Sequence, residues 1–137
     1  RLAALRDRLE AELQRRDGDV VRNGPAEGRL PNTANLSFAG VVGEALLYRT
    51  PQLAMSTGSA CSTATDADSH VLRAMGVDEA TSRASIRISL GRFTTATEID
   101  QAVEALVAAV KTIRGTRPTD APQGPLLDLK AYRPPPG

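Results

Sequence analysis

The chain has 137 residues, with 17 basic and 16 acidic side chains and a formal net charge of +1. This length suits one domain with a modest core, and the near-neutral charge offers no broad field for nucleic acid or anionic lipid. Aromatic residues make up 3% of the chain, which argues against a base-stacking surface, and no apolar run is long enough to span a bilayer.

The first half of the chain alternates between helical and extended patterns. Leucines recur at helical spacing from the start of the chain to about Arg16, which predicts an amphipathic helix. Shorter apolar runs bounded by glycine and proline follow, and these are typical of strands and turns. Strands are predicted at 19–22, 35–39 and 53–56, a loop at 24–32 and a helix at 42–48.

The second half contains the clearest patterns. Residues 85–90 alternate apolar and polar side chains, so a strand is expected with its apolar residues on one face and Arg87 and Ser89 on the other. Thr95 and Glu98 have the spacing of a capping box, which opens the best helix of the chain. Short helices are predicted at 69–75 and 78–83, and the buried stripe of the last helix at Ile99, Val103, Leu106, Val107, Val110 and Ile113.

These elements predict an α/β (α+β) domain in which helices cover one face of a short mixed or antiparallel sheet. The strands are too few for a doubly wound nucleotide-binding sheet, and the sequence contains no glycine-rich phosphate loop. We expect the domain to span residues 1–114. The stretch 115–137 is rich in proline and glycine, so we expect it to be a flexible tail.

The single cysteine, Cys61, lies in a segment of small and hydroxylic residues. A cysteine used for packing normally lies among large hydrophobic residues, whereas this context predicts a loop. A thiol there can serve as a nucleophile or a group carrier, with an incidental cysteine as the equally weighted alternative. One cysteine excludes an internal disulfide and fits a reducing, cytoplasmic location. One cysteine and one histidine cannot complete a normal zinc site, so no metal is expected.

Few other side chains are candidates for chemistry. Arg87 can offer a bidentate fork to a carboxylate, although an ordinary surface arginine is the commoner explanation of such a position. Arg92 is expected to close a turn. His70, the only histidine, is expected at the surface or in a helix cap, with a Cys–His pair left open. Neither Lys111 nor Lys130 has a context that suggests a cofactor-binding amine.

Three motifs follow one another in the chain: Ser-Thr-Gly-Ser-Ala-Cys at 56–61, Val-Leu-Arg-Ala-Met-Gly at 71–76 and Ser-Ile-Arg-Ile-Ser-Leu-Gly-Arg-Phe-Thr at 85–94. Together they resemble the C-terminal small domain of the pyridoxal-phosphate-dependent cysteine desulfurases, in the class V aminotransferase family. Residues 32–38, followed by Gly-Glu-Ala-Leu-Leu, also fit that family. The resemblance covers about residues 2–114, and the length of the cysteine segment resembles the subgroup with a long, mobile cysteine loop.

The resemblance implies a role for two residues. Cys61 matches the nucleophile that takes sulfur from L-cysteine as a persulfide, with release of L-alanine, and passes it to a sulfur acceptor or iron–sulfur scaffold protein. Arg87 matches the arginine that holds the α-carboxylate of the substrate. The family is homodimeric, chiefly through a domain that this chain lacks. The cysteine-loop residues beside the thiol are Gly58, Ser59, Ala60 and Ser62.

The family also implies a cofactor site that this sequence does not contain. Its members hold pyridoxal phosphate through a lysine in a larger N-terminal domain, with a histidine on the ring and an aspartate on its nitrogen. No Ser-x-His-Lys-like stretch occurs here, so we expect the absent large domain to bind the cofactor and this chain alone to be inactive. The chain also starts without Met inside a helical pattern, and we expect it to be a fragment.

Two alternatives stay open. The first is a domain of a related selenocysteine lyase or transaminase, against which the Gly-Ser-Ala-Cys context favours the desulfurase. The second is a non-catalytic sulfur-relay or binding module, which the missing cofactor lysine permits.

Overall fold

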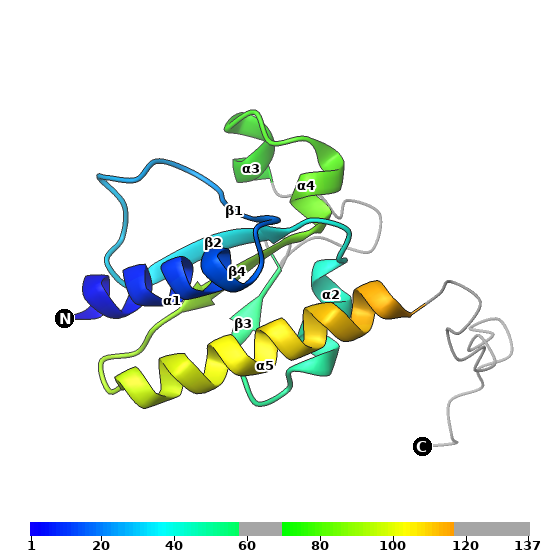
Figure 1. Ribbon diagram of the computed structural model, residues 1–137. Helices are drawn as coiled ribbons and strands as arrows, with labels where there is room; N and C mark the ends of the chain where they lie inside the picture. The colour runs from blue at the N-terminus through cyan, green and yellow to red at the C-terminus, as the bar shows by residue number, and fades with distance from the viewer. Residues whose placement is uncertain (58–69, 117–137) are drawn as a thin grey trace, which may run out of the picture.

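The computed structural model describes residues 1–57 and 70–116 (Figure 1). Cys61, its neighbours in the cysteine loop and the tail beyond 116 therefore lie outside the described residues. Among the helices that the structure describes, none combines the length and apolarity needed to cross a bilayer. The elements are α1 (Leu2–Arg16), β1 (Val20–Arg22), β2 (Thr33–Phe38), α2 (Gly43–Arg49), β3 (Met55–Ser56), α3 (His70–Ala74), α4 (Glu79–Arg83), β4 (Ser85–Ser89) and α5 (Ala96–Gly115).

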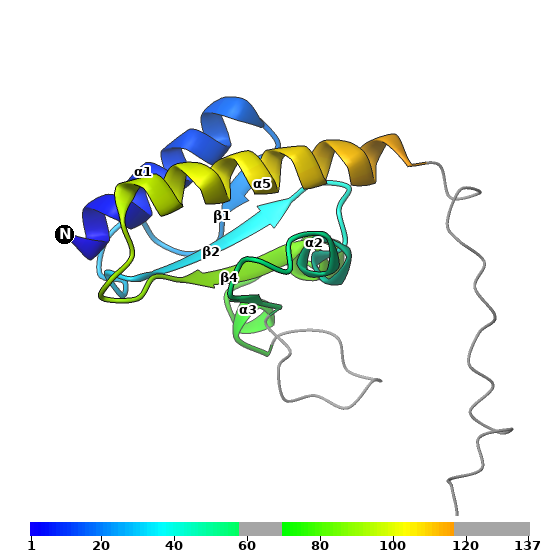
Figure 2. The same ribbon diagram turned by 90° about the horizontal axis from the view of Figure 1, so that it is seen from below.

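The four strands form one sheet in the order β1-β2-β4-β3, and all three pairings are antiparallel. The predicted α/β class is thus confirmed, with an antiparallel rather than a mixed sheet. Helices α1 and α5 lie side by side on one face of this sheet, and α3 lies on the other side (Figure 2). The strand predicted at 53–56 is shorter than expected, because the Leu53 amide donates to the Thr50 carbonyl in the turn after α2.

The core lies between the sheet and the α1/α5 layer. The alternation predicted for β4 is confirmed, since its isoleucines are buried while Arg87 and Ser89 are exposed. Opposite them, α5 buries most of its predicted stripe, and α1 contributes two leucines. Burial of a large aliphatic side chain stabilises a fold by about 1.5–3 kcal/mol, so this layer supplies the main driving force. Fully or almost fully buried members include Leu9, Leu13, Leu36, Phe38, Ile86 and Leu106.

The predicted capping box is confirmed at the start of α5. The Thr95 side chain accepts a hydrogen bond from the Glu98 amide at 3.2 Å, and the Glu98 carboxylate accepts one from the Thr95 amide at 2.8 Å. These bonds satisfy amide groups that the first turn of a helix leaves without partners. They fix where α5 begins, and therefore which side chains it presents to the sheet.

The loop before β2 is held to α1 by ion pairs that the sequence pattern did not predict. Arg29 donates to the buried carboxylate of Glu10 at 2.7 Å, and this hydrogen bond raises the pKa of the Arg29 guanidinium above its ordinary value. Arg6 donates to the Leu30 carbonyl at 2.6 Å. The loop therefore enters β2 along a defined path.

The first residue of α2, Gly43, packs against the backbone that leads into β4. A Cβ at this position would lie 2.9 Å from the Ser85 carbonyl oxygen and 3.2 Å from that of Arg83. Real Cβ atoms do not approach backbone oxygens so closely, so α2 or β4 would have to shift. Gly43→Ala is expected to lower the free energy of unfolding by about 1–3 kcal/mol, the usual cost of overpacking.

Urea unfolding of the chain measures this change directly. Gly18→Ala is the matched control, because a Cβ on Gly18 meets no atom within 4 Å and its φ is not positive. An equal unfolding midpoint for both variants would show that α2 does not rest on the β4 backbone as described.

Candidate functional site

Arg87 lies in a row of polar residues that crosses the sheet. The register pairs Arg87 with Asn35 of β2 on one side and with Ser56 of β3 on the other. Directly opposed residues of antiparallel strands point to the same face. The three side chains therefore share the face of the sheet that is turned away from α1 and α5.

The guanidinium of Arg87 is exposed and has no partner among the described residues. Neither an ion pair nor a hydrogen bond joins it to the described parts of the chain, 1–57 and 70–116. Other arginines are engaged: Arg8 binds Asp100 through both carboxylate oxygens, and Arg114 pairs with Asp17 at 2.9 Å. A planar fork with free N–H donors is suited to bind a carboxylate in a bidentate manner.

A hydrogen-bonded cluster lies beside Arg87 on the same face. The side chain of Asn23 donates to Asn35 at 2.7 Å and to Ser85 at 2.9 Å, and it accepts from Ser37 at 3.0 Å. The Ser85 hydroxyl donates to the Thr81 carbonyl at 2.6 Å. The sequence motifs do not reveal this cluster. Its signal was the alternation along β2, which puts Asn35 and Ser37 on one face.

Helix α4, which carries Thr81, is itself capped. The carboxylate of Asp78 accepts hydrogen bonds from the backbone amide and the hydroxyl of Thr81, both at 2.9 Å. The backbone hydrogen bond, with the hydroxyl bond second, lowers the pKa of the Asp78 carboxyl. The ionised Asp78 carboxylate therefore stabilises the fold at neutral pH, and this stabilisation is lost as the pH falls through the lowered pKa.

Two other sequence candidates, Arg92 and His70, lie in a turn and at the start of a short helix. Arg92 stacks on the Phe93 ring at 4.5 Å, and the Thr94 amide donates to the Gly91 carbonyl at 3.1 Å, which confirms a turn there. His70 is the first residue of α3. In the described ranges 1–57 and 70–116, no three metal-binding side chains come together.

The residues near Arg87 do not provide the amine that pyridoxal phosphate would require. Lys111 is exposed on α5, and α5 packs on the opposite face of the sheet from Arg87. Lys130 lies outside the described residues. The described chain therefore contributes a carboxylate-binding group to this face but no lysine for the cofactor.

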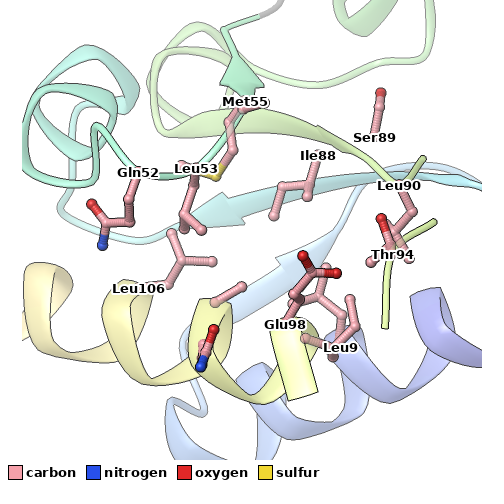
Figure 3. Close-up of a pocket in the computed structure, with 14 residues that line it drawn as sticks. Leu9, Gln52, Leu53, Met55, Ile88, Ser89, Leu90, Thr94, Glu98 and Leu106 are labelled. Atoms are coloured by element: carbon pink, nitrogen blue, oxygen red, sulfur yellow. The ribbon is translucent and has the colours of Figure 1, made fainter. Parts of the chain in front are cut away.

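A groove of about 470 Å³ lies between the β3–β4 edge and α5 (Figure 3). Its lining is mainly apolar and includes Ile88, Leu90 and Leu106 of the core, and Arg87 is not part of it. Glu98 is the one ionisable residue in its lining, and that carboxylate already accepts hydrogen bonds in the capping box. Among the described residues that line it, the groove therefore has no free charged group for chemistry.

Comparison with known proteins identifies the family. The chain is 41% identical over 133 residues to a human protein named cysteine desulfurase, an alignment that covers 97% of this chain and 29% of the relative. It is 45% identical over 115 residues to "Cysteine desulfurase IscS" of Vibrio campbellii, covering 84% of this chain and 28% of the relative. The chain corresponds to one segment of the cysteine desulfurase family.

Solved structures of NifS-like proteins share the fold of this chain. The fold matches a structure named "NIFS-LIKE PROTEIN" with a TM-score of 0.68 at 28% identity, covering 81% of this chain and 27% of that chain. A NifS-like protein from Rickettsia africae matches with a TM-score of 0.63 at 29% identity, over 84% of this chain and 28% of that one. No protein-family model matches the sequence. The chain thus spans less than a third of the length of these relatives.

Proposed function

We propose that this chain supplies the sulfur-accepting cysteine and the carboxylate-binding arginine of an enzyme that converts L-cysteine to L-alanine. The observation that carries the proposal is the pairing of Ser56 with Arg87. The segment that contains Cys61 leaves the sheet at Ser56, five positions before the thiol. Five residues span at most about 18 Å, so the thiol and the free guanidinium can serve one substrate.

The proposed reaction is a transfer of one sulfur atom. The Cys61 thiolate attacks the sulfur of the bound L-cysteine, an S–S bond forms and the C–S bond of the substrate breaks. The electron pair of the C–S bond stays on the carbon, which takes up a proton and leaves as L-alanine. Cys61 is left as a persulfide, and Arg87 keeps the substrate oriented through its carboxylate.

The cofactor and the partners are part of the same proposal. We assign pyridoxal phosphate to a part of the protein outside this chain, because Lys111, the lysine within the described residues, lies on the helix that packs against the opposite face of the sheet from Arg87. The persulfide is passed to an acceptor or iron–sulfur scaffold protein, and the parent enzyme is a cytoplasmic homodimer. A thiol on a segment of small residues suits such a transfer, since the segment has few bulky side chains to anchor it.

The test is intact-mass analysis of the longest natural reading frame that contains this chain, after incubation with pyridoxal phosphate and L-cysteine. One added sulfur atom on Cys61, with alanine released, is the expected result. Cofactor binding without a persulfide would support a related lyase or transaminase instead. If even the longest frame binds no cofactor, the chain is a sulfur-relay module.

A further inference from the structure

The orientation of the Asn23 side chain is determined by a backbone oxygen. A carbonyl can only accept, so the Ser85 hydroxyl must use its one proton toward the Thr81 carbonyl, 2.6 Å away. The Ser85 oxygen is then an acceptor for its other neighbours. The atom of Asn23 that lies 2.9 Å from it must be the amide nitrogen, Nδ2.

The Asn23 amide determines the orientation of Asn35 in turn. With Nδ2 toward Ser85, the Asn23 oxygen faces the Ser37 hydroxyl at 3.0 Å, and that hydroxyl has its one proton for either this oxygen or the Ser85 oxygen, 2.9 Å away. The same Nδ2 donates to the Asn35 side chain at 2.7 Å, so the Asn35 atom there must be its oxygen, Oδ1. The backbone amide of Asn23 also donates to the Asn35 carbonyl at 2.9 Å. Asn23 therefore holds both the backbone and the side chain of Asn35.

This arrangement leaves the amide nitrogen of Asn35 as a free donor near Arg87. In the described ranges 1–57 and 70–116, no acceptor takes a hydrogen bond from Asn35 Nδ2. Asn35 and Arg87 are register partners, and such pairs have Cβ atoms about 4.5–5.5 Å apart on the same face. Asn35 and Arg87 thus present donors without described acceptors from paired positions on one face, and two such donors are complementary to an anion with two oxygens.

We propose that Asn35 is a second carboxylate-binding residue, whose amide nitrogen donates to the α-carboxylate of the substrate beside the Arg87 guanidinium. The inference rests on the proposed desulfurase function and adds a residue to its substrate site. Asn23 is a positioning residue, because it acts by orienting the Asn35 amide and does not itself contact the substrate.

The decisive variant is Asn35→Asp in the full protein that contains this chain. Aspartate keeps the oxygen that accepts from Asn23 but replaces the donor nitrogen with a second, negatively charged oxygen. That oxygen repels the substrate carboxylate and pairs with Arg87. Loss of one hydrogen bond to a charged group raises KM by roughly 10-fold to 100-fold. Because Asn35→Asp also adds a repulsive charge, the KM for L-cysteine is expected to rise by more than this, while kcat changes much less.

Asn32→Asp is the matched control, because it is the same isosteric change three residues earlier. The donor lost there faces the Leu90 carbonyl, not the Arg87 site. Asn35→Ala should raise KM within the 10-fold to 100-fold range. Urea midpoints of all variants separate a loss of binding from a loss of folding.

The outcomes separate this inference from the function on which it rests. If the unmodified protein releases no alanine, the proposed function is wrong and this inference is overturned with it. If alanine is released and Arg87→Ala raises KM, but Asn35→Asp behaves like Asn32→Asp, the function stands and Asn35 has only a structural role. A rise in KM that is specific to the two Asn35 variants is the result that we expect.

Discussion

Replacing Cys61 with serine in the full protein should abolish persulfide formation and leave pyridoxal phosphate bound. A serine side chain has nearly the same shape, but its oxygen is a far weaker nucleophile at neutral pH than a thiolate and cannot hold sulfane sulfur. The expected mass after incubation with L-cysteine is that of the unmodified protein, and alanine release should fall to background. The absorbance of the bound cofactor should stay unchanged.

Ser62→Ala is the matched control for this variant, since it changes the next residue of the same segment and leaves the thiol intact. It should still form the persulfide. If Cys61→Ser loses the cofactor absorbance, the cysteine supports cofactor binding and does not carry sulfur. If Cys61→Ser releases alanine at the normal rate, another group accepts the sulfur.

Replacing Arg87 with alanine should lower kcat/KM for L-cysteine by about 100-fold or more, mainly through a higher KM. A bidentate contact between a guanidinium and a carboxylate contains two charge-assisted hydrogen bonds, each with a net contribution of about 1.5–3 kcal/mol. No carboxylate among the described residues pairs with this guanidinium, so the variant should leave no protein group unpaired there. Steady-state kinetics and a urea unfolding curve together measure the effect.

Arg87→Lys should recover only part of the loss, because lysine keeps the charge but not the planar fork. Arg49→Ala removes an exposed arginine from α2 and should leave the kinetics unchanged. Unaltered KM and kcat in Arg87→Ala would instead show that Arg87 is an ordinary surface residue of β4.

Local patterns were sufficient to predict most elements of the fold. The leucine spacing of α1, the Thr95–Glu98 capping box of α5 and the alternation at 85–90 each involve residues within a few positions of one another. Interactions at such short separation appear in the sequence as periodicity, so their type and face could be predicted. Strand limits were less accurate: β2 begins at Thr33 instead of Asn35, because Thr33 pairs with Ser89, a partner far away in the chain.

The sequence by itself determined the two faces of β4, the single thiol at Cys61 and the motifs that resemble the desulfurases. It could not determine that Arg87 lies between Asn35 and Ser56, because cross-strand register depends on pairing between distant segments. The orientation of the Asn35 side-chain amide could not be predicted from the sequence either. It depends on a hydrogen-bond relay from the Thr81 carbonyl through Ser85 and Asn23, and only the tertiary structure brings these groups together.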